Sequence, residues 1–106
     1  MSEITLVYVL FPDVEGARAA SRTLVTERLA ACANILGPCL SIYEWDGATK
    51  EAAEIPTLFK TNAELAPALI ARIAELHSYD VPAILSWPSG PVHGPFAEWV
   101  RTQVTS

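Results

Sequence analysis

The order of apolar and polar positions predicts one α+β chain of alternating strands and helices. Apolar residues fill positions 4–11 almost without interruption, which is typical of a central strand covered on at least one face. Asp13 is a favourable helix N-cap, and apolar residues then recur at helical spacing to about Ala31. Residues 32–43 follow as a long predicted strand, because they favour extended backbone.

Proline and glycine divide the next part of the chain into a hairpin. Gly37 and Pro38 interrupt the strand 32–43, and we expect a bulge or bend in an edge strand there, because proline cannot donate to a strand ladder. Residues 46–47 are Asp-Gly, a strong hairpin-turn signal, so residues 50–60 form the return strand. Pro56 within it is a second sign of an edge or a bulge.

The remaining pattern completes a known order of elements. A capping-box pattern at 61–64 precedes a second helix that ends near 77–78, and Pro67 indicates a start a few residues after 61. A short strand at 83–87 and a terminal helix with Pro95 at its first position follow. The order β-α-β-β-α-β plus a helix predicts a ferredoxin-like α+β sandwich, with two helices on one face of an antiparallel sheet.

Composition changes this picture by predicting self-association. The 106 residues suffice for a single domain, 1–106, with a modest core. The chain is 51% hydrophobic and only 18% charged, so a monomer would expose much apolar surface. The predicted hairpin also projects strand edges that need partners. Both features predict a homo-oligomer in which strands of different copies pair.

Charge and cysteine usage exclude several classes of partner. The net charge is −5, and seven Lys and Arg residues spread along the chain form no basic stripe, so we expect no nucleic-acid binding. We expect no membrane span, because no apolar run is long enough for one. We expect no signal peptide, because the N-terminus has no basic region followed by an apolar core and a cleavage site. Cys32 and Cys39 have odd spacing, which disfavours a disulfide and indicates reduced thiols in a cytoplasmic protein.

Two side chains are candidate metal ligands. His77 is the stronger, because imidazole binds copper and zinc and His77 stands beside Tyr79 and Asp80. The alternative is a residue at a helix end that bonds backbone carbonyls. Cys32 is either a soft ligand or a small buried hydrophobe. Arg28 is interpreted as a side chain that reaches solvent from the last turn of the first helix, and the alternative is an ion pair at an interface.

Aromatic residues and a lysine form a candidate ligand cleft between subunits. Its members are Tyr43, Trp45, Lys60, Tyr79 and Trp87. Lys60 would hold a small anion or pair with a neighbour's carboxylate, and the alternative is interface packing with one ion pair. The sequence contains no G-x-S-x-G, H-E-x-x-H or P-loop motif, so we expect a protein that is not an enzyme.

Four blocks of sequence resemble the CutA family, the divalent-cation tolerance proteins. They are ERLAACANI at 27–35, SIYEWDG at 41–47, FKT at 59–61 and ELHSYDVPAI at 75–84. The resemblance implies a ferredoxin-like fold related to the PII signalling proteins. It also implies a homotrimer in which strands of neighbouring subunits pair edge to edge.

The resemblance also implies a function. Family members alter tolerance to copper and other divalent cations, and copper binding has been attributed to cysteine and histidine. Cys32 and His77 match such family positions, although Ser78 replaces the usual proline and no cysteine stands near Leu10. We therefore expect a trimer that binds Cu(II) or another divalent metal weakly, with no obligatory cofactor. The alternative is a PII-like regulatory module that binds a small anionic ligand or a partner protein at the intersubunit cleft.

Overall fold

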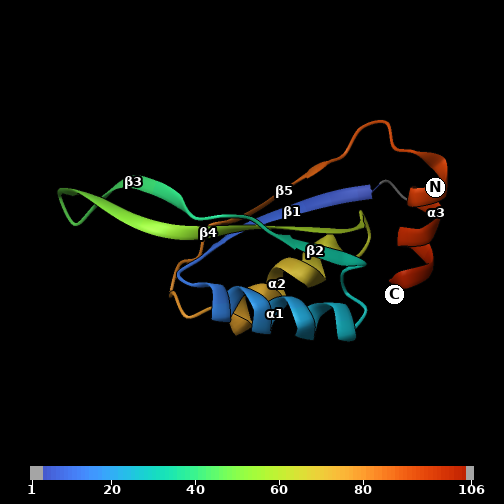
Figure 1. The fold of residues 1–106 in the computed structure, drawn as a ribbon, viewed down its shortest axis with the longest axis horizontal. Coiled ribbons are helices and arrows are strands. Elements are labelled where there is room, and N and C mark those ends of the chain that lie inside the picture. The colour runs from blue at the N-terminus through green and yellow to red at the C-terminus, as the bar shows by residue number, and fades with distance from the viewer. Residues whose placement is uncertain (1–3, 105–106) are drawn as a thin grey trace.

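The computed structural model describes residues 4–104 and has the predicted order of elements, with one strand divided in two. The elements are β1 (Ile4–Phe11), α1 (Val14–Thr26), β2 (Cys32–Ile35), β3 (Cys39–Trp45), β4 (Ala48–Asn62), α2 (Ala66–Leu76), β5 (Ile84–Pro88) and α3 (Gly94–Gln103). The strands are antiparallel in the order β2-β4-β1-β5, and β3 pairs with a further part of β4. Helices α1 and α2 lie on one side of the sheet, and α3 lies at its end (Figure 1).

Alternation along the central strands gives the sheet a covered face and an open face. Val7, Val9 and Phe59 are completely buried. They pack in one cluster with Leu24 of α1 and Leu69 of α2. The intervening residues of the central strands point away from these helices, so the open face is available to another molecule.

The hairpin forms a two-stranded ribbon, made of β3 and residues 48–54 of β4, that extends beyond the rest of the sheet (Figure 1). Asp46 and Gly47 form its turn with φ values of 53° and 75°, which confirms the predicted turn. Glycine adopts such positive values without strain, and a two-residue turn of this type needs both. On one face of the ribbon Leu40 and Ile42 are 64% and 63% exposed.

Pro56 lies inside the sheet, opposite the bulge at residues 36–38, so of the two possibilities predicted for this residue the bulge is confirmed and the edge is wrong. It pairs with Leu10 of β1 on one side, and on the other its carbonyl accepts a hydrogen bond of 2.9 Å from the N–H of Leu36. The missing N–H faces the same side as that carbonyl, where residues 36–38 leave the ladder. The pairing register with β4 changes by one residue between β2 and β3, which confirms the predicted bulge there.

The first helix is shorter than predicted. It ends at Thr26 rather than near residue 31, because Arg28 adopts a left-handed φ of 64°. The N–H groups of Arg28 and Leu29 bond back into the helix as in a Schellman motif. The guanidinium of Arg28 donates to the carbonyl oxygen of Thr102 at 2.9 Å. Arg28 therefore links the end of α1 to α3 and does not belong to a last helical turn.

The capping box predicted before the second helix is also wrong. Thr61 lies in β4, where its hydroxyl donates to the carbonyl oxygen of Leu29 at 2.8 Å. The side chain of Asn62 instead accepts the N–H of Leu65 at 2.8 Å. Helix α2 begins after this turn and carries Pro67 in its first turn, where a missing N–H costs nothing.

Candidate functional site

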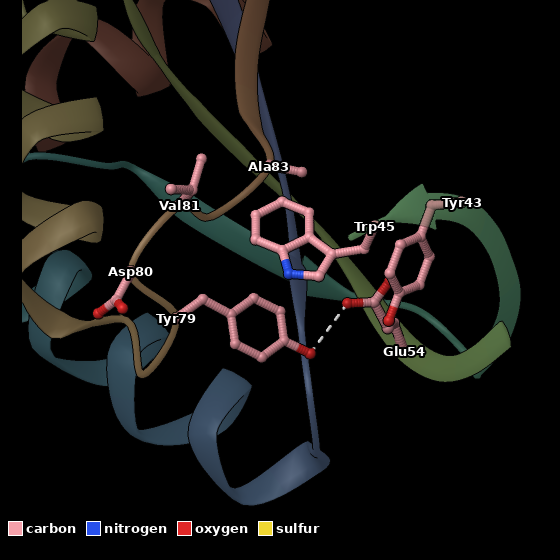
Figure 2. A pocket seen from close by; sticks show the side chains of 7 residues that line it. All are labelled: Tyr43, Trp45, Glu54, Tyr79, Asp80, Val81 and Ala83. Carbon is pink, nitrogen blue, oxygen red and sulfur yellow. Dashed lines mark hydrogen bonds between the residues drawn. The ribbon is translucent and has the colours of Figure 1, made fainter. Parts of the chain in front are cut away.

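A cavity of about 360 Å³ opens where the ribbon leaves the sheet. Its volume lies in the range of about 300–1,000 Å³ that is typical of small-molecule sites. The lining residues are Tyr43, Trp45 and Glu54 of the ribbon and Tyr79, Asp80, Val81 and Ala83 of the loop between α2 and β5. Figure 2 shows the indole of Trp45 reaching from the ribbon toward this loop, with Glu54 near the phenol of Tyr79.

Glu54 is the buried acid of the cavity. Glu54 is only 7% exposed, and its Oε2 accepts a hydrogen bond of 3.1 Å from the hydroxyl of Tyr79. Burial raises the pKa of Tyr79, and the hydrogen bond to Glu54 and the charge of Glu54 raise it further. The phenol therefore stays protonated and donates. Asp80 is the second acid, and none of the seven lining residues is basic.

His77 holds the loop wall of the cavity in place. Its Nδ1 accepts the backbone N–H of Tyr79 at 3.1 Å, which assigns the ring proton to Nε2. Nε2 then donates to the carbonyl oxygen of Leu10 at 2.7 Å. The imidazole also stacks on Phe11, with ring centroids 5.0 Å apart. Both nitrogens are occupied, so a metal can bind His77 only if one of these hydrogen bonds breaks.

Cys32 and Lys60 lie together in another part of the sheet. They are opposite each other in the pairing of β2 with β4. Burial raises the pKa of the Cys32 thiol, and the charge of Lys60 partly opposes this effect. The amino group of Lys60 donates to the side-chain oxygen of Asn34. Along β4, Lys60 is about 20 Å from Glu54, at roughly 3.3 Å per residue, so it does not reach the cavity.

The structure therefore brings together only part of the predicted cleft. Tyr43, Trp45 and Tyr79 share the cavity, whereas Lys60 does not line it. Trp87 lines a separate groove beside α2. Glu54 was not among the predicted site residues, and its only signal in the sequence is an acidic residue directly before the apolar part of its strand.

The described residues 4–104 of one chain do not form a ready metal site. Within residues 4–104, no three His, Cys, Asp or Glu side chains lie close enough together to hold an ion. The two candidate ligands belong to different regions, because Cys32 is opposite Lys60 and His77 is bonded to β1 at Leu10. Ligation by Cys32 and His77 stays a prediction.

Among residues 4–104, no helix is long and apolar enough to cross a bilayer.

Comparisons with known proteins agree over nearly the whole chain. The family described as CutA1 divalent ion tolerance protein matches residues 5–103. Divalent-cation tolerance protein CutA of Thermus thermophilus is 40% identical over 101 residues, which are 95% of this chain and 96% of that protein. Protein CutA of Homo sapiens is 35% identical over 102 residues, which are 96% of this chain, and the match spans 56% of the human protein.

Solved structures agree with this assignment. The crystal structure of CutA from Xylella fastidiosa matches with a TM-score of 0.95 and 35% identity, over 98% of this chain and 100% of that chain. The agreement extends to the α+β architecture, with its antiparallel sheet and three helices. By sequence and by fold, this chain belongs to the CutA1 divalent ion tolerance protein family.

Proposed function

We propose that this chain acts as a homotrimer in the response to divalent cations. The relation to divalent cations follows from the family. The apolar surfaces that one copy leaves exposed support self-association, and three copies rather than two follow from the resemblance to the CutA trimers. We also infer a ferredoxin-like topology from the strand order, with α1 and α2 on one face.

The ribbon is the observation that carries this proposal. Within residues 4–104, β3 pairs with β4 alone, so its other edge has no strand beside it. Leu40 and Ile42 are both exposed by more than half, and burying one such side chain fully stabilises a protein by about 1.5–3 kcal/mol. Sister copies that lie against the ribbon would pair its edge and cover these side chains.

The open face of the sheet adds a second apolar surface. Tyr8 of β1 lies between Leu58 of β4 and Leu85 of β5. Its ring centroid is 6.4 Å from that of Trp87. Leu85 and Trp87 are 51% and 41% exposed. Copies arranged about a symmetry axis would cover these faces mutually.

We infer that the protein binds metal weakly and has no obligatory cofactor. Cu(II) prefers nitrogen and thiolate ligands, but both nitrogens of His77 are bonded and burial raises the pKa of Cys32. Each site must therefore lose a hydrogen bond or a proton before it binds. Both cysteines are free, which agrees with a reducing, cytoplasmic location.

The assembly is tested by light scattering after size exclusion at micromolar concentration. We expect a mass of about three times the 11.5 kDa of one chain. A monomeric mass contradicts the proposal.

The ligand assignment is tested by isothermal titration with Cu(II). We expect weak binding, with a dissociation constant larger than about 1 µM. The affinity should fall further in His77→Gln and Cys32→Ser. His93→Gln and Cys39→Ser are the matched controls, since neither residue is a candidate ligand. Equal copper affinity in all four variants, or the absence of copper binding, contradicts the assignment.

A further inference from the structure

We propose that the cavity between the ribbon and the loop binds a small organic cation that carries an alkylated ammonium group. Three aromatic side chains, Tyr43, Trp45 and Tyr79, line this cavity together with the buried carboxylate of Glu54 (Figure 2). The proposal goes beyond the metal response. It requires only that the cavity stays open in the assembled protein.

The aromatic walls of the cavity suit a cation. Rings attract a cation placed over their faces within about 6 Å of the centroid, and tryptophan does so best. Within residues 4–104, the ring pairs in contact do not join any two of Tyr43, Trp45 and Tyr79. Trp45 is 55% exposed although it lines the cavity. Tyr79 contacts His77, with ring centroids 4.8 Å apart, but it stays 38% exposed, and Tyr43 is 42% exposed. All three rings therefore have surface available for a ligand.

The charged residues of the cavity also favour a cation. Glu54 is buried and accepts one hydrogen bond, from Tyr79, although a carboxylate has acceptor capacity for several. Asp80 adds a second acid, and no lining residue is basic. A buried negative charge is stabilised by an opposite charge beside it. The same field opposes an anion, so the anionic ligand expected from the sequence does not suit this cavity.

Size and ligand number favour an organic cation over a bare metal ion. Divalent cations such as Ca²⁺ and Mg²⁺ take about six or more oxygen ligands, and no group of three potential ligands exists among the described residues. An alkylated ammonium needs no coordinating atoms. Its methyl groups would contact the rings and the side chain of Val81, while its charge lies near Glu54.

The experiment compares choline with dimethylbutanol, the uncharged isostere in which carbon replaces nitrogen. Both are titrated into the purified full-length protein by calorimetry, and the indole N–H signals are followed by NMR. We expect saturable choline binding at least about tenfold tighter than that of dimethylbutanol, with a shift of the Trp45 signal. Equal affinities, or no saturable choline binding, overturn the proposal.

Matched variants locate the site. Glu54→Gln and Trp45→Leu should each weaken choline binding by about tenfold. Glu51→Gln changes an exposed acid on the other face of the same strand, and Trp99→Leu changes an exposed tryptophan of α3, so both should leave choline affinity unchanged. Choline affinity that is unaffected by Glu54→Gln and Trp45→Leu overturns the proposal. The indole N–H signals of the unaltered protein test it even where a variant fails to fold.

The outcomes separate this proposal from the metal response. Copper binding without choline binding overturns the ammonium site and leaves the metal proposal intact. Choline binding by a protein of monomeric mass supports the ammonium site and contradicts the trimer.

Discussion

Strand β4 passes through two regions, one buried and one exposed to solvent. Near its end, Phe59 is completely buried beneath the two helices. Near its start, Glu51 is exposed and lies opposite Ile42, which is 63% exposed. The same backbone pairing supports both regions. A strand therefore buries a face only where a second layer covers it, and among residues 4–104 no such layer covers the ribbon face that carries Leu40 and Ile42.

The cavity lies at the junction of these two regions. Glu54 comes from the last part of the ribbon and Tyr79 from the loop that follows α2. His77 ties this loop to β1 through its hydrogen bond to Leu10. The covered layer thus supplies a rigid support, while the ribbon supplies aromatic side chains that the fold itself does not need for its core.

The covered layer should respond most strongly to substitution. Phe59→Ala removes a completely buried ring and should lower the free energy of unfolding by about 3–5 kcal/mol. Urea unfolding followed by circular dichroism measures this loss. Val14→Ala, at a residue that is 38% exposed on α1, should cost less than about 1 kcal/mol. Similar losses in both variants would show that the two regions do not differ as described.

The ribbon should affect assembly and leave the domain folded. The double variant Leu40→Asp with Ile42→Asp places charges on its exposed apolar face, so we expect an about threefold fall in mass by light scattering with unchanged helix content. Val14→Asp with Val25→Asp alters two half-exposed residues of α1 and should keep the trimer. An unchanged mass of the ribbon variant would contradict a role of this face in assembly.

Substitution of His77, which holds the loop wall of the cavity in place, should have an intermediate effect on stability. His77→Ala removes the hydrogen bonds to Leu10 and Tyr79, so we expect a loss of about 1–3 kcal/mol in the free energy of unfolding. Hydrogen exchange at the amide of Tyr79 should also become faster. His93→Ala, at an exposed residue before α3, should change neither measurement. Equal results for the two histidines would remove His77 from this supporting role.

The smallest effect is expected at the end of α1. Arg28→Gly and Arg28→Ala both lose the bond to Thr102, but only glycine adopts the positive φ of this position without strain. The glycine variant should therefore be more stable than the alanine variant by about 1 kcal/mol. Thermal unfolding of the two variants measures the difference. An alanine variant as stable as the glycine variant contradicts the strain.

The local residue pattern predicts helices and strands, because secondary structure depends largely on residues that are neighbours in sequence. Apolar continuity gave β1, and the Asp46-Gly47 pair gave the hairpin turn with its positive φ values. The break at residues 36–38 was also predicted, because proline limits strand pairing wherever it stands. Tyr43, Trp45 and Tyr79 of the predicted cleft line one cavity, and their role in binding a ligand stays a prediction.

Residue pattern and composition suffice to predict the order of strands and helices and the excess of apolar surface. Which distant groups meet depends on the folded arrangement. It placed Pro56 opposite the bulge, bonded His77 to Leu10, and set Glu54 against Tyr79 while Lys60 faces Asn34. These contacts join residues far apart in the chain. They depend on strand register and on the path of a loop, which local preferences do not encode.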